Sequence, residues 1–440
     1  MEVRDPIHGV IRLSDAERIV VEHPFVQRLR LIRATGFSVA AFPSATQTRF
    51  AHSLGVMHLA GHAFDSAYEG WDFSNAVARR RLRACLRLAA LCHDLGHSPF
   101  SHCTEFAMPP LEALCIDWFA DSVLRDRRST HEDYTIAILE NTSLSRVIDQ
   151  ASPCTARHVA SLISLDVTLP DDFFVDGGMD HRRVLSQIVS SELDVDRLDY
   201  LGRDSYHTGA RYGQVDVQWL LSHMRAHPSG DHMTLALDAS AIYAFDDFLI
   251  ARHHMFLMVY FHHKSVVYEE MLKRYVVQPD CPWQLSADLD VYLYQDDVDL
   301  LHHLRTSSDP WARRIVERRP YKRVLELHGT PTEIDLTLDV AALHEAGIRT
   351  LEASATGRLS RYEAIGQKRR SAPEILVIER FSGRRARQEQ LPGMAKNPAL
   401  RTLNEVTEVF QRYADDRRVA RIFVPPDQER AASAVLDGLR

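Results

Sequence analysis

LCHDLGHSPFSH, residues 91–102, gathers four metal-ligating or acid–base side chains among apolar and small residues: His93, Asp94, His97 and His102. Imidazole and carboxylate groups rarely enter a core unless they are paired or hold a metal. His97 follows His93 by one helical turn and shares its face, whereas His93 and Asp94 diverge by about 100° on an ideal helix. Both can bind one ion if it lies beside the end of the helix. Such a mixed donor set suits Mn, Fe, Zn or Ni better than Ca or Mg.

Two further segments carry the residue types that a metal site needs. TRFAHSLGVMHLAG (48–61) begins a predicted helix with Arg49 and His52 in its polar first turn. SSELDVDRLDYLGRDSYHTG (190–209) is dense in carboxylates, and by itself it is equally well explained as a solvated helix face. On a helix, the following residues of that segment share or border one face: Asp196, Asp199, Tyr200, Arg203 and Asp204.

These segments belong to a longer series of motifs that resembles one family. DPIHG, FVQRLRLIRATG, TRFAHSLGV, HDLGHSPFSH, THEDYT and DVDRLDYLGRDSYHTG occur in the order and wording of the HD-domain metal-dependent phosphohydrolases. The match is closest to the branch of the deoxynucleotide triphosphohydrolases, which includes the human SAM- and HD-domain-containing enzyme and its bacterial relatives. The similarity covers about residues 3–275 strongly, and a SAM domain is absent from this sequence.

The resemblance implies a metal site with positions left open for water and a phosphate oxygen, as catalytic sites require. Its ligands are His52, His93, Asp94 and Asp196. The implied cofactor is a divalent transition metal (Mn, Fe, Ni or Zn), with Mg as a further cation carried by the substrate phosphates. The alternative is a polar core network without a metal.

The resemblance also implies the reaction, which is hydrolysis of a deoxynucleoside triphosphate (dNTP) to a deoxynucleoside and inorganic triphosphate. His102 would donate a proton to the 5′-oxygen, and Glu105 would orient its ring and raise its pKa. His97 and His131 would line the phosphates or hold a second cation, and would be most useful as protonated donors.

Substrate contacts follow from the same resemblance. Arg49 resembles a phosphate clamp, and Arg197 stands where related sequences have a basic residue that faces the phosphates. Tyr200 would pack under C2′ and exclude a ribose hydroxyl, while Asp204 would accept a hydrogen bond from the 3′-OH. Tyr260 is a candidate pocket wall, although a core aromatic explains it equally well.

One position departs from the family pattern. Ala34-Thr35-Gly36 stands where the human sequence has Gln-Leu-Gly, and that glutamine reaches the substrate sugar in the family. Alanine cannot make this contact, so we expect looser recognition of the 3′-OH than in enzymes that carry the glutamine.

An effector site is a weaker implication. Glu22, Gln27 and Arg30 resemble the residues with which homo-oligomeric relatives bind a GTP, dGTP or dNTP effector between their subunits. The resemblance therefore also implies that this protein forms a homo-oligomer, either a dimer or a tetramer. The acid is Glu instead of Asp, and the lysine expected just upstream of DPIHG is missing. The alternative is an amphipathic helix with ordinary surface polar residues.

The pattern along the chain predicts a mainly α fold, with an HD-domain helical core over 1–315 and a small α/β or α+β domain over 316–440. The segment 245–276 is expected to form one long helix or two abutting ones, 172–181 and 225–233 to be loops, and 233–238 to be a strand. In the C-terminal part we expect strands at 322–329, 374–381 and 420–426 and helices at 339–347, 399–414 and 427–439.

Composition sets the class of protein. The 440 residues are 45% hydrophobic and 25% charged, without an apolar run near the roughly 18 residues of a membrane span or a signal-peptide pattern, so we expect a cytoplasmic globular protein. The net charge of −8 argues against a dedicated duplex-DNA binder. Basic runs at 79–83, 318–323 and 384–387 are mostly explained as solvated faces, although a minority of such runs bind phosphates.

Two alternatives to the triphosphohydrolase remain open. The first keeps the metal and changes the substrate, giving a phosphodiesterase or phosphatase that acts on another nucleotide. The second is a nucleic-acid-binding or sensory protein with a vestigial site.

Overall fold

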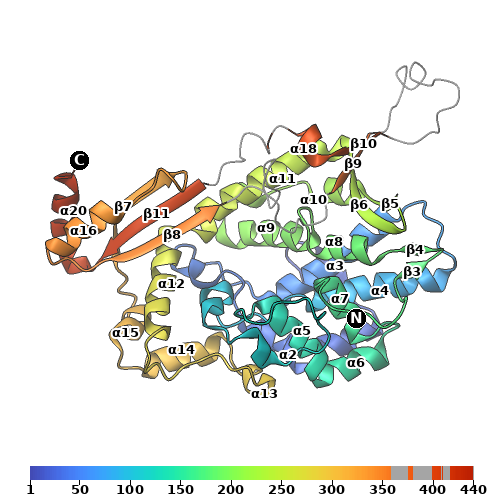
Figure 1. Cartoon of the computed structure of the whole chain (residues 1–440), viewed down its shortest axis with the longest axis horizontal. Coiled ribbons are helices and arrows are strands. Elements are labelled where there is room, and N and C mark those ends of the chain that lie inside the picture. Colours follow the sequence, from blue (N-terminus) through green and yellow to red (C-terminus); the bar gives the residue numbers. More distant parts are fainter. Residues whose placement is uncertain (358–374, 380–398, 408, 410–416, 440) are drawn as a thin grey trace, which may run out of the picture.

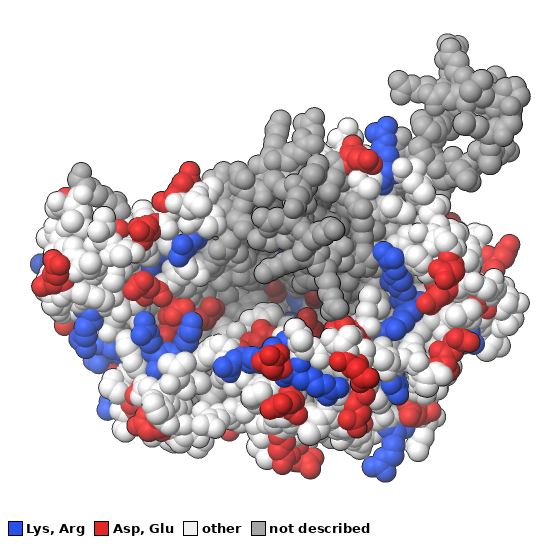
Figure 2. Space-filling model, in the orientation of Figure 1, with Lys and Arg blue, Asp and Glu red and all other residues white. Residues whose placement is uncertain are grey.

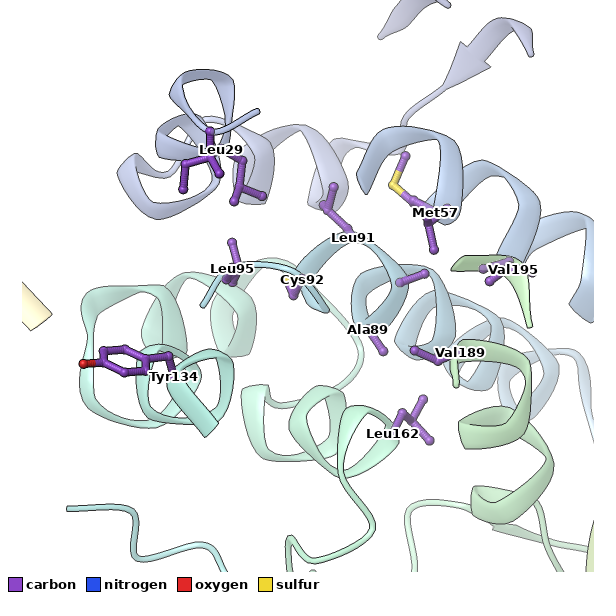
Figure 3. Packing of buried hydrophobic residues seen from close by; sticks show 14 of the residues in the cluster. Leu29, Met57, Ala89, Leu91, Cys92, Leu95, Tyr134, Leu162, Val189 and Val195 are labelled. Atoms are coloured by element: carbon purple, nitrogen blue, oxygen red, sulfur yellow. The ribbon is translucent and has the colours of Figure 1, made fainter. Parts of the chain in front are cut away.

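Two helices form the centre of the protein, α3 (Arg49–Ala67) and α4 (Ala76–Cys92). α3 is buried along most of its length, as expected of a helix that carries apolar or small residues on every side. The side chain of Asn75 caps the start of α4 by accepting hydrogen bonds from two backbone amides. In Figure 3, Ala89 and Leu91 of α4 lie between Met57 of α3 and Leu162 of a neighbouring helix, so the C-terminal half of α4 is enclosed by the core.

Further helices surround this pair in the computed structural model, which describes residues 1–357, 375–379, 399–407, 409 and 417–439 (Figure 1). They are α1 (Asp15–Val21), α2 (Pro24–Arg28), α5 (His131–Asn141), α6 (Ser143–Ala151), α7 (Ala156–Ile163), α8 (Arg182–Val189), α9 (Val195–Thr208), α10 (Val217–Ser222), α11 (Ile242–Met255), α12 (His263–Val276), α13 (Leu289–Tyr292), α14 (Asp297–Thr306) and α15 (Pro310–Val316).

The long apolar segment 245–276 is divided. α11 ends at Met255, a π-helical segment covers Phe256–Tyr260, and α12 begins at His263, so the prediction of two abutting helices is confirmed. A π-helical turn inserts an extra residue into the helical repeat and often occurs at functional sites. Here Tyr260 is the last residue of this segment.

Two small sheets belong to this helical body. β1 (Glu2–Asp5) and β2 (Gly9–Arg12) form an N-terminal hairpin. The other sheet has the order β10–β9–β6–β4–β3, with β5 on the free side of β6. Its strands are β3 (Val175–Asp176), β4 (Met179–Asp180), β5 (Met224–Ser229), β6 (His232–Asp238), β9 (Leu376–Glu379) and β10 (Ala399–Thr402).

The structure corrects two expectations here. The segment 225–233 is mostly strand, because Met224–Ser229 pairs antiparallel with β6 and only the tip around Gly230 turns. The predicted helix 399–414 begins as strand β10, followed by the short helix α18 (Leu403–Val406), and most of its remainder lies outside the described residues. The predicted strand at 233–238 is confirmed, and the predicted loop 172–181 contains the short hairpin of β3 and β4.

At one end of the molecule lies a separate three-stranded antiparallel sheet (Figure 1). It consists of β7 (Lys322–Gly329), β11 (Arg417–Val424) and β8 (Leu351–Gly357), with β11 in the middle. α16 (Thr337–Glu345) and α20 (Glu429–Asp437) pack against it around a second hydrophobic cluster that includes Leu343 and Ile422. The predicted mainly α fold with a small C-terminal α+β part is therefore confirmed.

The predicted C-terminal region is not confined to this small sheet. β9 pairs in parallel with β6 of the helical body, and β10 pairs with β9. In addition, Arg421 of β11 donates a hydrogen bond to the carbonyl oxygen of Phe261 at 2.6 Å. The chain after residue 316 thus contributes strands to the helical body as well as to the small three-stranded sheet. The domain boundary at 315 stays a prediction.

The surface carries charges of both signs. On the face shown in Figure 2, basic and acidic side chains are interspersed over the described part of the chain. Within the described residues, no helix has both the length and the apolar character needed to cross a membrane. The basic run at 384–387 lies outside the described residues.

Candidate metal centre and active site

Three helices bring the four predicted metal ligands together. His52 lies in the first turn of α3, His93 and Asp94 lie at the end of α4, and Asp196 lies in the first turn of α9. His52 Nε2 lies 2.9 Å from Asp196 Oδ1 and 3.6 Å from Asp94 Oδ2. His93 Nε2 lies 3.2 Å from Asp94 Oδ1 and 3.7 Å from Asp196 Oδ1. The donor atoms of His52, His93 and Asp94 thus lie within 4.8 Å of one another, and Asp196 lies beside both imidazoles.

The two imidazoles are oriented as metal ligands are. His52 Nδ1 shares a hydrogen bond of 2.7 Å with Asp199, and His93 Nδ1 donates to the carbonyl oxygen of Ala90 at 2.8 Å. A carbonyl oxygen only accepts, which assigns the proton of His93 to Nδ1 and leaves the Nε2 lone pair free. Both Nε2 atoms are buried and make no hydrogen bond. Each nitrogen lies near a carboxylate oxygen without a well-directed hydrogen bond, so the residues present fit a bound cation.

The charges around the four ligands favour a cation as well. Burial opposes ionisation of Asp94, but Arg49 and the neighbouring histidines hold the pKa of this carboxyl well below its usual range. Burial also opposes a charge on His52, yet Asp196 and Asp199 raise the pKa of His52 to about 10. The carboxylates therefore attract positive charge to this point, which a divalent metal supplies when it displaces the proton.

Two glycines allow the ligand-bearing helices to approach. A Cβ on Gly55 of α3 would overlap the Asp199 carboxylate of α9 and lie 2.5 Å from Arg203 NH2. A Cβ on Gly96 would overlap the backbone at the start of α5 around His131. The glycine of HDLGH is thus required by close packing, and so is the glycine of HSLGV.

A second group of histidines adjoins the metal ligands. Nitrogen atoms of His97, His102 and His131 lie within 4.8 Å of one another, and the rings of His97 and His131 stack with their centroids 4.0 Å apart. Although burial opposes it, Glu105 contributes to raising the pKa of His131. Burial, Arg49 and His131 lower the pKa of His97. These surroundings favour the charged form of His131 and oppose the charged form of His97, and the contact of both with phosphates stays a prediction.

Glu105 lies between two of these histidines. It accepts hydrogen bonds from His102 Nδ1 at 2.9 Å and from His131 Nδ1 at 2.7 Å. The His102 side chain is 63% exposed, so its Nε2 can be reached from outside. The structure thus brings together the pair that sequence reasoning proposed as proton donor and orienting carboxylate.

Arg49 is tied to the metal ligands. Its NH1 donates to Asp94 Oδ2 at 2.8 Å and its Nε donates to the hydroxyl of Ser101 at 2.9 Å. Its NH2 reaches the carbonyl of Ala34 at 3.3 Å, at the position where the family glutamine is missing. Arg49 therefore lies at the edge of the site with its guanidinium already fixed in orientation.

The predicted sugar contacts form one cluster. Asp204 accepts hydrogen bonds from Tyr260 Oη at 2.8 Å and from Gln47 Nε2 at 2.7 Å. The ring of Tyr200 meets that of Tyr260 edge-on, with centroids 6.1 Å apart. Burial raises the pKa of Asp204. Tyr260 is thus in contact with the other predicted pocket residues.

The remaining predicted residues form contacts within the chain, and their predicted roles stay predictions. The Arg197 guanidinium donates hydrogen bonds to Asp194 and to the carbonyl oxygen of Ser191. The three predicted effector residues lie on or beside α1 and α2 and bond nearby groups of the same chain. Glu22 pairs with Arg18, Arg30 donates to Gln27, and Gln27 donates to the carbonyl of Val21.

Sequence reasoning missed His8 and Gln47 in this region, and it gave Asp199 no role beyond its place on the polar face of its helix. His8, in DPIHG, bonds Asp199 at 2.6 Å, and Asp199 in turn orients His52. Gln47 holds Asp204. The signals were the motif DPIHG itself and the position of Asp199 one turn after Asp196, but neither reveals a partner that is distant in sequence.

Comparison with known proteins agrees with these features. Residues 49–204 match the HD domain, and residues 215–354 match the HD-associated region. An uncharacterized protein of Methanocaldococcus jannaschii is 28% identical over 323 residues, which are 73% of this chain and 59% of that protein. The deoxynucleoside triphosphate triphosphohydrolase SAMHD1 of Gallus gallus is 26% identical over 353 residues, 73% of this chain and 55% of its own. The chain thus spans between half and three fifths of the length of these relatives.

A solved structure shares the whole fold. A hypothetical protein from Aquifex aeolicus superposes with a TM-score of 0.73 at 22% identity, and the match covers 99% of each chain. The two matched regions, the helical fold and the convergence of the HD residues lead to one assignment. The chain carries an HD domain followed by an HD-associated region.

Proposed function

We propose that this protein is a metal-dependent phosphohydrolase that converts a dNTP to a deoxynucleoside and inorganic triphosphate. The observation that carries the proposal is the combination, on one helix, of a metal ligand with residues suited to a deoxyribose. Asp196, Tyr200 and Asp204 follow one another at four-residue intervals along α9. Successive members are therefore about 6 Å apart along the helix axis.

The four ligands would hold the cation through His52 Nε2, His93 Nε2 and the two carboxylates. Asp199 and the carbonyl of Ala90 keep both imidazoles in the tautomer that ligation requires. A bound divalent cation lowers the pKa of a water molecule and neutralises charge on a phosphoryl oxygen. The imidazole and carboxylate donors favour Mn, Fe, Ni or Zn as the resident metal.

The leaving group needs a proton. In the proposed reaction, water adds to the α-phosphorus and the bond from phosphorus to the 5′-oxygen breaks, so the deoxynucleoside leaves as an alcohol. His102, whose Nδ1 is bonded to Glu105, can present Nε2 to this oxygen. His131 is held by the same carboxylate and can donate to the phosphates.

The sugar is recognised by shape and by one carboxylate. The Tyr200 ring would close the space beside C2′, which excludes a ribose hydroxyl, and Asp204 would accept a hydrogen bond from the 3′-OH. Tyr260 and Gln47 fix the Asp204 carboxylate for this contact. Homo-oligomerisation and a nucleotide effector at Glu22, Gln27 and Arg30 stay predictions, as does a cytoplasmic location.

Product analysis tests the proposal. The purified protein, supplied in turn with Mn, Fe, Ni or Zn, is incubated with a mixture of dNTPs and the products are separated by chromatography. Deoxynucleoside together with inorganic triphosphate supports the proposal. Pyrophosphate or phosphate as product would assign the site to a phosphodiesterase or phosphatase. A salt-sensitive gel shift without any turnover would favour a nucleic-acid-binding protein with a vestigial site.

A further inference from the structure

A pocket of about 930 Å³ lies between β2, α1, α3 and α4, and none of the predicted metal ligands lines it. Its lining includes the basic run 79–83 that the function proposed above does not use. It contains five arginines and two histidines: Arg12, Arg80, Arg81, Arg83, Arg87, His58 and His62. The only carboxylate in the lining is Glu17.

Carboxylates pair with three of the five arginines. The pairs are Arg87 with Glu17 at 2.6 Å, Arg83 with Asp65 at 2.7 Å and Arg12 with Glu2 at 3.1 Å. Within the described part of the chain, neither Arg80 nor Arg81 forms an ion pair with a carboxylate, and Arg81 Nε is buried without a hydrogen bond. Arg81 instead donates to the carbonyl of Val175 and lies over the ring of Phe173.

The pKa of His58 is affected by the positive groups around it. Burial and the neighbouring positive groups, His62, His8 and Arg87, lower its pKa to about 4. Because the whole chain carries a net charge of −8, a local excess of arginine in one pocket is unusual for this protein. The pocket is therefore suited to an anion.

The volume of the pocket and its apolar wall indicate which kind of anion could bind there. Ligand sites for small molecules commonly measure about 300–1,000 Å³. Between the arginines the wall is apolar, with Val10, Leu13, Val77 and Pro153. Guanidinium groups bind phosphate through paired donors, whereas the apolar wall suits a base or another flat group.

A chain of contacts joins this pocket to the metal centre. The ring of His58 lies 5.5 Å from that of His8, measured between centroids. His8 bonds Asp199 Oδ1 at 2.6 Å, and Asp199 Oδ2 bonds His52 Nδ1 at 2.7 Å. His8 belongs to the turn between β1 and β2, and β2 contributes Val10 and Arg12 to the pocket.

We propose that this arginine pocket binds a phosphate-bearing small molecule with an apolar or aromatic portion, and that its occupancy changes the affinity of the metal centre through His58, His8 and Asp199. The site is separate from the active site and from Glu22, Gln27 and Arg30. Its binding step does not depend on dNTP hydrolysis, so its failure is distinguishable from failure of the proposed function.

Binding is tested on the full chain loaded with Mn²⁺, with AMP as the probe, because a single phosphate chelates Mn²⁺ only weakly. Calorimetry compares the wild type with the double variant R80E/R81E and with R146E, which reverses an exposed arginine on α6. We expect the double variant to weaken AMP binding by about tenfold or more and R146E to leave it unchanged. Equal binding by all three proteins overturns the proposal.

Replacing AMP with inorganic phosphate distinguishes the contribution of the arginines from that of the apolar wall. Weaker binding of phosphate than of AMP supports a role for the apolar wall, and equal binding refutes it. If AMP does not bind to the wild type and the double variant instead changes the oligomeric state in sedimentation, the pocket is an interface between copies and the proposal is overturned.

Coupling is tested by the Mn²⁺ affinity, measured by electron paramagnetic resonance with and without saturating AMP. We expect AMP to change this affinity by about fivefold or more in the wild type. In His8→Phe, which removes the hydrogen bond to Asp199, AMP should still bind but the change should be lost. An Mn²⁺ affinity that is indifferent to AMP in the wild type overturns the coupling.

Discussion

Asp199 orients His52: the two share a hydrogen bond of 2.7 Å between Asp199 Oδ2 and His52 Nδ1, and Arg203 and His8 bind the same carboxylate. Asp199 is fully buried, so its charge is stabilised only by these partners. It bonds the His52 nitrogen that points away from Asp94 and Asp196, and so leaves Nε2 to face the candidate metal site.

Asp199→Asn tests this role. The amide keeps the shape of the side chain but loses the charge that favours the Nδ1 proton of His52. We expect Mn²⁺ affinity to fall by about 10–100-fold, the usual effect of removing a group that orients a metal ligand. Titration of the purified protein with Mn²⁺ measures this, with Asp121→Asn, an exposed carboxyl, as the control. An unchanged Mn²⁺ affinity would show that Asp199 does not orient His52 for metal binding.

The close approach of α3 and α9 depends on Gly55. An alanine there overlaps the Asp199 carboxylate, so Gly55→Ala should cost about 1–3 kcal/mol of unfolding free energy and reduce metal retention. Gly202→Ala on α9 is the matched control, because its Cβ would meet only Ile7 Cγ2, at 3.8 Å. Denaturant unfolding of both variants gives the comparison, and equal stabilities would contradict the packing argument.

A substitution of His102 should affect proton donation without affecting metal binding. Since His102 is exposed and bonds only Glu105 among the described side chains, His102→Gln should leave the fold and the Mn²⁺ content intact. The turnover number should fall by about 10²–10⁴-fold, as is usual when a general acid is lost. Steady-state kinetics and metal analysis on the same sample check both expectations. A variant with full turnover would assign the proton transfer to another group.

Sugar recognition should tolerate changes at C3′. Ala34 has no side chain that can reach the sugar, so recognition of the 3′-OH falls to Asp204. We expect dATP and its 3′-deoxy analogue to differ less in kcat/KM than they do in relatives that carry the glutamine. Parallel assays of the two nucleotides measure the ratio. Complete inactivity on the analogue would show that another group reads the 3′-OH.

The free energy of unfolding should decrease as the pH rises from about 4.5 to about 7, because of Glu269. Burial raises the pKa of this carboxyl from 4.5 to about 7. In that interval the unfolded chain releases a proton that the folded protein keeps, so the folded state loses stability as the pH rises. Glu269→Gln should remove this loss and raise Tm at pH 8 more than at pH 4.5. Thermal melts at both pH values test it, and a pH-independent effect would contradict it.

Sequence patterns were sufficient where chemistry is local. The 3.6-residue apolar stripe of α4 predicted its helix, and the resemblance of the motifs to the HD-domain phosphohydrolases brought His52, His93, Asp94 and Asp196 into one hypothesis. The strands β7 and β11 were predicted as well, because their apolar residues form short runs.

Contacts between distant segments could not be predicted in this way. No local pattern pairs His8 with Asp199, or Gln47 with Asp204. The contact of the Arg197 guanidinium with Asp194, three residues earlier, was not predicted either. Strand β5 was interpreted as a loop because Pro228 and Gly230 lie close together, and only its pairing with β6 makes it a strand.

The parallel pairing of β9 with β6 has a consequence for any attempt to isolate the catalytic body. A fragment that stops near residue 315 would lack β9, and the outer amide and carbonyl groups of Ala236–Asp238 would lose their partners. Bare strand edges recruit other chains, so such a fragment would be prone to self-association and aggregation. The C-terminal segment therefore protects the edge of a sheet that lies far from it in the sequence.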